Sequence, residues 1–136
     1  MQIHLQRQLS VAIENAPGRL AAVSSLLADR GLNIEGLCVI NNVEQGMLRM
    51  ILSDGASART ILEGAGFPVI EADVLNLELT DRLGKLARVT AALAAANINI
   101  EYAYATVDHA GARTRMVLKT THPRKALHLL EAIQEP

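Results

Sequence analysis

The stretch G-R-L-A-A-V-S-S-L-L-A-D-R-G-L-N-I-E, residues 18–35, returns 66 residues later as G-K-L-A-R-V-T-A-A-L-A-A-A-N-I-N-I-E, residues 84–101. The same shift aligns the chain from Leu9 to Ser53 with its second half without a gap, and 13 of these 45 positions are identical. A self-match at a fixed period is the mark of a duplicated structural unit. We therefore divide the 136 residues into a first repeat, residues 1–72, and a second repeat, residues 73–136.

Both repeats contain the same order of local patterns. Apolar residues at every second position predict a strand, and apolar residues three and four apart predict the helix that follows it. A hairpin and a second helix come next, so the order is that of the βαββαβ, ferredoxin-like class of α+β folds, with helices on one face of an antiparallel sheet. The expected ranges are strand 9–13, helix 17–31, hairpin 33–53 and helix 57–65, then strand 75–79, helix 81–97, hairpin 99–119 with its turn at 108–111, and helix 123–134.

The fourth strand of the second repeat is missing from its expected place. Residues 67–72 supply that strand in the first repeat, but the second repeat stops at Pro136. The 66-residue shift places residues 67–74 on residues 1–8, where Ile3 and Leu5 alternate with polar residues. We expect residues 2–6 to complete the sheet of the second repeat. The two repeats would then pack as a pseudo-twofold pair.

Four segments resemble ACT domains: ENAPGRLAAV (14–23) and GLNIEGL (31–37) in the first repeat, DRLGKLARV (81–89) and NINIEYA (97–103) in the second. The family pattern is a polar residue and a Gly in the turn before the first helix, then an apolar helix, then Asn-Ile at the start of the next strand. Both repeats match it, so the chain resembles a stand-alone tandem ACT-domain protein. The resemblance implies a regulatory module that binds an amino acid, often where two ACT units meet, and controls an enzyme.

The turn before each first helix also has the chemistry to bind a zwitterion. A helix N-terminus offers unpaired backbone N–H groups and the positive end of the helix dipole to a carboxylate. A Gly there removes the Cβ that would block a ligand, and amide or carboxylate oxygens accept hydrogen bonds from an ammonium. The candidate ligand-binding residues are Asn15, Gly18, Arg19, Leu20 and Asn33 in the first repeat, and Asp81, Gly84, Lys85, Leu86 and Asn99 in the second.

Each candidate also has a purely structural interpretation. The two Gly residues would serve only helix–sheet packing, the polar residues of the turns would only cap helices or end loops, and the cations would be solvated. The two turns differ in charge, because Asn15 is neutral where Asp81 carries a carboxylate. We therefore expect two sites of unequal affinity, or one site to which each turn contributes a different part.

Composition excludes several other functions. Thirteen basic and fourteen acidic residues give a net charge of −1, which argues against nucleic-acid binding, and no apolar run approaches the ~20 residues of a membrane span;. Cys38 is the only cysteine, so no internal disulfide forms, and we expect a buried thiol in a cytoplasmic protein;. The four His residues lack metal-ligand spacing, and no catalytic constellation stands out. We expect no metal, no cofactor and no enzymatic activity.

Two surface features remain. Tyr102 and Tyr104 lie at the same parity as Ile100, so we expect them to face the helices, not a stacked RNA base. The opposite face of the sheet is expected to be apolar, which favours sheet-to-sheet homodimerisation or a partner enzyme. The residues expected on that face are Leu37, Val39, Ile51, Ala103, Ala105, Val107 and Val117.

The sequence thus predicts a non-catalytic amino-acid-binding regulatory module, with its ligand at the junction of the repeats and held by the two Gly turns. The alternative is an interaction protein or regulatory subunit that docks on a metabolic enzyme without a ligand of its own. A small enzyme on a ferredoxin-like fold is a third, weaker interpretation.

Overall fold

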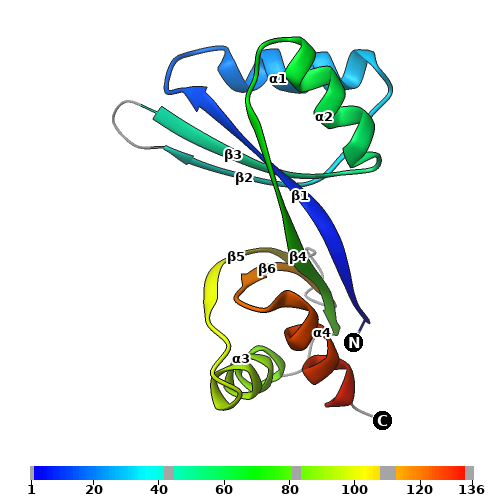
Figure 1. Ribbon diagram of the computed structural model, residues 1–136, viewed down its shortest axis with the longest axis vertical. Coiled ribbons are helices and arrows are strands. Elements are labelled where there is room, and N and C mark those ends of the chain that lie inside the picture. The colour runs from blue at the N-terminus through cyan, green and yellow to red at the C-terminus, as the bar shows by residue number, and fades with distance from the viewer. Residues whose placement is uncertain (1, 42–44, 81–83, 108–112, 134–136) are drawn as a thin grey trace. The chain divides into compact units, whose positions relative to one another are not determined.

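A computed structural model describes residues 2–41, 45–80, 84–107 and 113–133 (Figure 1). It is an α+β structure with six strands and four helices among the described residues. In chain order these are β1 (Gln2–Glu14), α1 (Arg19–Asp29), β2 (Ile34–Asn41), β3 (Gln45–Leu52), α2 (Gly55–Gly64), β4 (Val69–Thr80), α3 (Lys85–Ala95), β5 (Ile100–Val107), β6 (Arg113–Thr120) and α4 (Pro123–Ala132). The predicted fold class is confirmed.

The chain forms two compact units, which are not the two repeats. The first compact unit is Arg7–Ala72, and the second compact unit joins Met1–Gln6 to Asp73–Pro136. Each therefore contains part of β1 and part of β4. In the second compact unit, Ile3 and Leu5 pack against the core beneath α3 and α4, and Asn76 Nδ2 donates a hydrogen bond to Gln6 Oε1 at 2.6 Å.

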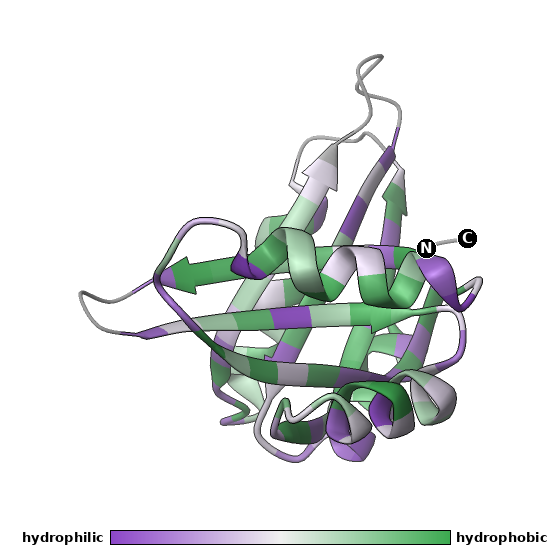
Figure 2. Cartoon of the chain, turned by 90° about the horizontal axis from the view of Figure 1, so that it is seen from above, coloured by the Kyte–Doolittle hydropathy of each residue, from purple (hydrophilic) through white to green (hydrophobic). Residues whose placement is uncertain are grey.

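Within the first compact unit the strand order is β2-β3-β1-β4, and within the second it is β5-β6-β4-β1. The pairings of β3 with β1 and β2, and of β6 with β4 and β5, are antiparallel. Two helices cover one face of each sheet (Figure 1). Hydrophobic residues run along the strands, with hydrophilic residues interspersed on strands and helices (Figure 2).

Each unit has its own aliphatic core between sheet and helices. The first core is built around Leu9, Val11, Val23, Leu27, Leu48, Met50, Ala58 and Leu62. The second is built around Leu75, Leu77, Val89, Leu93, Met116, Leu118, Ala126 and Leu130. These residues are the apolar stripes that the helical and strand periodicities predict, because each element buries one face.

The first helix of each unit ends as the sequence predicts. Gly31 and Asn97 both adopt positive φ, at 73° and 58°. The N–H of Leu32 donates to the carbonyl of Leu27, and that of Ile98 to Leu93, at 3.0 and 2.9 Å. These are Schellman closures, which favour Gly or Asn at the residue after the helix.

The constant 66-residue shift does not continue through the hairpins. Leu9 pairs with Met50, whereas Leu75 pairs with Leu118, so β3 and β6 correspond at a shift of 68. The second hairpin connection is two residues longer, and an even insertion leaves every side chain on its original face;. The sequence-identical pairs Arg49/Arg115, Met50/Met116 and Leu52/Leu118 are therefore not structural equivalents.

A β-bulge overturns the predicted faces of β2 and β5. The register with the neighbouring strand shifts between Ile34 and Gly36, and again between Ile100 and Tyr102. One extra residue reverses the alternation beyond it. Tyr102 and Tyr104 therefore lie on the face of Lys119 and Val117, not on the helix side, and the prediction for the tyrosines was wrong.

The same bulge corrects the predicted apolar outer face. Leu37 pairs with Met50 and Val39 with Leu48, so Leu37 and Val39 lie on the helix side of the sheet. Ala103 and Ala105 also lie on the helix side, because they pair with Leu118 and Met116. Ile51 and Val117 do lie opposite the helices, yet they are only 1% and 7% exposed. The side chain of Val107 lies outside the described part of the chain. Of the residues expected on the outer face, the exposed Leu37 and Val39 thus lie on the helix side.

Candidate ligand-binding site

The turn before α1 is a type II turn. The N–H of Arg19 points to the carbonyl of Ala16 at 3.5 Å, with Pro17 and Gly18 at the two central positions. Gly18 has φ 84° and ψ −4°. Pro at the first central position and Gly at the second are the residues that a type II turn requires. The local sequence therefore fixes the direction in which the chain enters α1.

Gly84 has the same conformation, with φ 87° and ψ −4°, at the start of α3. A Cβ added to Gly18 or Gly84 would meet no atom within 4 Å. The two Gly residues are therefore required by their positive φ and not by tight helix–sheet packing. The space beside each turn is open.

The helix ends that follow these turns have no side-chain cap. Neither Gly18 nor Gly84 has a capping side chain, whereas α2 is capped by Asp54, which accepts hydrogen bonds from the N–H of Ser57 at 3.1 Å and from its hydroxyl at 2.7 Å. The Ser57 hydroxyl, and then its N–H, hold the pKa of Asp54 below its usual value. Among the described residues, the N-cap Gly of α1 and that of α3 thus provide no side-chain oxygen to the N–H groups of the first helical turn;.

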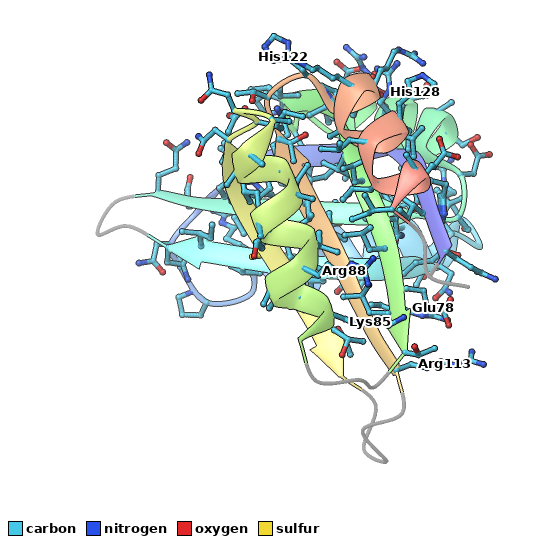
Figure 3. All side chains as sticks on the ribbon, turned by 90° about the horizontal axis from the view of Figure 1, so that it is seen from below. Glu78, Lys85, Arg88, Arg113, His122 and His128 are labelled. Carbon is cyan, nitrogen blue, oxygen red and sulfur yellow. The ribbon has the colours of Figure 1, made fainter. Side chains whose placement is uncertain are left out.

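A cation follows each Gly, but the two cations have different surroundings. Arg19 Nη2 lies 2.9 Å from Glu14 Oε2, so its charge is offset by the last residue of β1. The position that matches Glu14 in the second repeat is Thr80. Lys85 has no counter-ion among the described residues, and it projects from the first turn of α3 together with Arg88 (Figure 3).

Two other cations of the described residues are ion-paired within their own compact units. Arg113 Nη1 lies 3.0 Å from Glu78 Oε1, at the adjoining ends of β6 and β4 (Figure 3). Arg59, on α2, contacts both Glu63 and Glu71 at 3.0 Å, which raises the pKa of the guanidinium further. Lys85 thus differs from these ion-paired cations, because no described residue is its counter-ion.

The structure places the predicted site residues in two groups. Asn15, Gly18, Arg19 and Leu20 lie around one turn, and all are exposed. Asn33 lies beyond the opposite end of α1, whose 11 residues span about 16 Å;. Within one unit, the asparagine and the Gly turn cannot contact the same small ligand.

The second compact unit repeats this division. Gly84, Lys85 and Leu86 are together at the start of α3, and Asn99 lies past its far end. Asp81 lies outside the described residues. The backbone of Asn99 exchanges hydrogen bonds with Thr121, as that of Asn33 does with Ser53, at 2.9–3.2 Å. Both asparagines therefore sit where a strand start is tied to the end of its hairpin partner.

The described residues contain no cluster of three or more His, Cys, Asp or Glu able to hold a metal ion. Cys38 is partly buried on β2, His122 is the N-cap residue of α4 and His128 lies within that helix, so none of them belongs to a Gly turn (Figure 3). Over the described residues, no helix combines the length and the apolar character that a membrane crossing demands.

The folds and turns of both units are those of ACT domains. The family model of the ACT domain pair matches residues 1–134, and the chain belongs to this family. The predicted resemblance is thereby confirmed. No curated protein matches the chain.

Solved structures extend the likeness over the whole chain. Protein BT0572 from Bacteroides thetaiotaomicron is 31% identical, with a TM-score of 0.88 over 96% of this chain and 89% of that one. The regulatory subunit of aspartate kinase from Thermus thermophilus is 20% identical, with a TM-score of 0.69 over 98% and 97% of the two chains. That from Thermus flavus is also 20% identical, with a TM-score of 0.66 over 97% and 96%. The two Thermus structures share the fold of this chain.

Proposed function

We propose that this protein is a non-catalytic regulatory module that binds an amino acid at its Gly turns. The observation that carries the proposal is the repeated arrangement of an αL Gly, an uncapped helix N-terminus and a cation in the first helical turn. Membership of the ACT domain pair family supports a regulatory role. The ligand is an α-amino acid or a close analogue.

The proposed pose follows from the charges of the turn. The carboxylate accepts hydrogen bonds from the first N–H groups of the helix, where the dipole favours an anion. The cation after the Gly adds a charge-assisted contact. A ligand side chain would lie against Leu20 or Leu86, which are both exposed.

The two turns differ in the free charge that they offer. Arg19 is held by Glu14, so a carboxylate at α1 competes with an existing ion pair. Lys85 has no such competitor among the described residues. We therefore propose that the ligand binds more tightly at the start of α3 than at the start of α1. The neutral Asn15 and the acidic Asp81 suggest the opposite order, because Asp81 would repel the carboxylate of the ligand.

Thermal denaturation against the twenty amino acids tests the proposal. A ligand present at one hundred times its Kd stabilises the folded state by about 2.7 kcal/mol, which raises the Tm by roughly 8–10 °C. We expect one or two amino acids to do this. A flat response to all twenty at 10 mM would contradict amino-acid binding.

Two lysines provide a matched pair of variants. Loss of a hydrogen bond to a charged group costs about 1.5–3 kcal/mol, so Lys85→Ala should raise the Kd roughly tenfold to a hundredfold in calorimetric titration. Lys125→Ala removes a first-turn cation of α4, which does not follow a Gly turn, and should leave the Kd unchanged. Equal effects of both variants would show that general charge, and not the α3 turn, attracts the ligand.

The second candidate function is a regulatory subunit that docks on an enzyme without its own ligand. Exposed aliphatic residues on β2 favour this candidate. A structural neighbour is described as the regulatory subunit of aspartate kinase, which makes an amino-acid kinase a reasonable first partner to test. Co-purification of such an enzyme from the native host, together with no response to any amino acid, would support docking over ligand binding.

A further inference from the structure

We propose that the outward face of α4 is a docking surface for an acidic segment of a partner protein. Four basic side chains, which we call the α4 basic face, are exposed on the N-cap and the first two turns of this helix: His122, Arg124, Lys125 and His128. Figure 3 shows the two histidines projecting outward from α4. The ion pairs of the described residues include none of these four side chains. This partner lies beyond the ligand function proposed above and does not depend on it.

The duplicated helix α2 shows which residues of α4 the fold requires. A shift of 68 residues, which relates the two hairpins, also relates α2 to α4. It places Ala58 on Ala126, and both are fully buried. It places Leu62 on Leu130, and these are fully buried as well. The fold thus keeps the same side chains where the second helix of each unit packs on its sheet.

The exposed positions of the two helices differ in charge. All four positions of the α4 basic face lack a basic residue in α2, where they are Asp54, Ala56, Ser57 and Thr60. Asp54 caps α2 by accepting hydrogen bonds from Ser57, whereas His122 makes no side-chain capping hydrogen bond. The same helix therefore forms without these cations, and packing does not explain them.

The cations of α4 also oppose the stability of the helix that carries them. Arg124 and Lys125 lie in the first turn, where the positive end of the helix dipole disfavours a cation;. Two adjacent like charges repel each other as well. A carboxylate bound at this face reverses both effects, because the dipole and the cations then attract it together. An anionic partner thus accounts for a charge distribution that the isolated helix disfavours.

The size of the α4 basic face favours an acidic protein segment over other anions. It combines two permanent cations with two imidazoles on a helix of 10 residues. Anionic membranes attract clusters of about four to eight Lys and Arg residues, and nucleic acids are bound through many phosphate contacts. The net charge of −1 supplies no wider basic surface of that kind.

The spacing of the cations suggests the conformation of the docked segment. Arg124 and His128 are four residues apart on one side of α4, which is about 6 Å along the helix axis. Carboxylates at every second residue of an extended chain are about 7 Å apart. Glu131 follows three residues after His128 and repels a further carboxylate, so the acidic run should end there. We therefore expect an extended segment with Asp or Glu at alternate positions.

Fluorescence anisotropy with a labelled peptide tests the proposal on the full-length protein. The probe is a fluorescein-labelled peptide of four Ser-Glu repeats, and the uncharged control has four Ser-Gln repeats. Loss of the charged hydrogen bonds should make the control bind roughly tenfold to a hundredfold more weakly. Amide shifts on binding of the Glu peptide should map to residues 122–131. No binding of the Glu peptide at 1 mM protein, or shifts confined to another element, would overturn the proposal.

Two single charge reversals locate the binding surface. Arg124→Glu should raise the Kd of the Glu peptide at least tenfold without lowering the Tm, because an acidic residue is favoured in a first helical turn. Arg30→Glu reverses an exposed charge at the end of α1 and should leave the Kd unchanged. Equal effects of the two variants would show attraction by general charge. Tighter binding of a single-stranded RNA or of phosphatidylserine vesicles than of the Glu peptide would overturn the assignment of an acidic protein partner.

Discussion

The first six residues should stabilise the second compact unit, although 66 residues of the first compact unit separate them from it in sequence. Deletion of residues 2–6 removes Ile3 and Leu5 from the core beneath α3 and α4, and it removes Gln6 from its hydrogen bond with Asn76. The remaining β1 residues, from Arg7 onward, belong to the first compact unit. The deletion therefore removes residues from the second compact unit and none from the first.

The magnitude follows from these contacts. Full burial of an Ile or Leu side chain is worth about 1.5–3 kcal/mol, so each of these half-buried residues contributes about 1 kcal/mol;. A hydrogen bond adds about 1 kcal/mol. The free energy of unfolding should fall by about 3 kcal/mol, from the 5–15 kcal/mol typical of a domain, and the Tm by roughly 10 °C.

Chemical denaturation measures the total loss, and hydrogen exchange shows where it occurs. Amides of β4 and β6 should lose protection, while those of β2 and β3 should keep it. Ile3→Ala with Leu5→Ala should reproduce about 2 kcal/mol of the loss, whereas Gln2→Ala with His4→Ala, on exposed positions of the same strand, should cost almost nothing. An unchanged Tm after deletion, or a loss confined to β2 and β3, would refute the assignment of these residues.

Three further predictions follow from single residues. Gly84→Ala should destabilise the protein by about 1–2 kcal/mol, because residue 84 has a positive φ;. Gly55→Ala lies in a helix with open space around it and should stabilise the protein by about 0.5–1 kcal/mol;. Thermal melts should therefore show Tm changes of opposite sign for the two variants. Thr120→Val should raise the free energy of unfolding by about 1 kcal/mol in urea titration, because the buried Thr120 hydroxyl has no hydrogen-bond partner among the described residues;. Asp54→Asn should destabilise the protein near neutral pH, and the difference from wild type should shrink as the pH falls through the lowered pKa of Asp54, because its ionised carboxylate accepts the Ser57 hydrogen bonds more strongly than its protonated form does; an unchanged difference at pH 2 would contradict this;.

The parts of the fold that the sequence predicts are those with strong periodicity. The helices, their Gly31 and Asn97 closures and the two cores follow from apolar spacing and from residues that tolerate positive φ;. The faces of β2 and β5 do not follow, because a bulge of one residue at Glu35 and Glu101 reverses an alternation that looks continuous in the sequence. The two extra residues of the second hairpin are equally invisible in the sequence, because an even insertion keeps each side chain on its face of the sheet. The constant 66-residue shift even aligns Arg49 with Arg115, which are not structural equivalents.

The backbone conformation of the Gly turn before α1 could be predicted from the sequence, but the ion pairing of its cation could not. Pro17 and Gly18 specify a type II turn from local sequence alone;. The ion pair of Arg19 with Glu14 depends on where the end of β1 lies relative to the first turn of α1, which local sequence does not determine. A comparison of the repeats nevertheless indicates this difference in ion pairing. Thr80 stands at the position of Glu14, whereas Lys85 keeps the positive charge of Arg19.

The duplication separates what the fold requires from what a ligand would require. Both units keep the αL Gly with nearly identical dihedral angles, and a positive φ suffices to explain it without any ligand;. A cation at the start of a helix is not explained in this way, since the dipole disfavours it there. Because no described residue offsets Lys85 as Glu14 offsets Arg19, the strongest argument for an anionic ligand rests on α3 and not on the glycines. Binding that survives Lys85→Ala but is lost in Arg19→Ala would reverse this order and place the tighter site at α1.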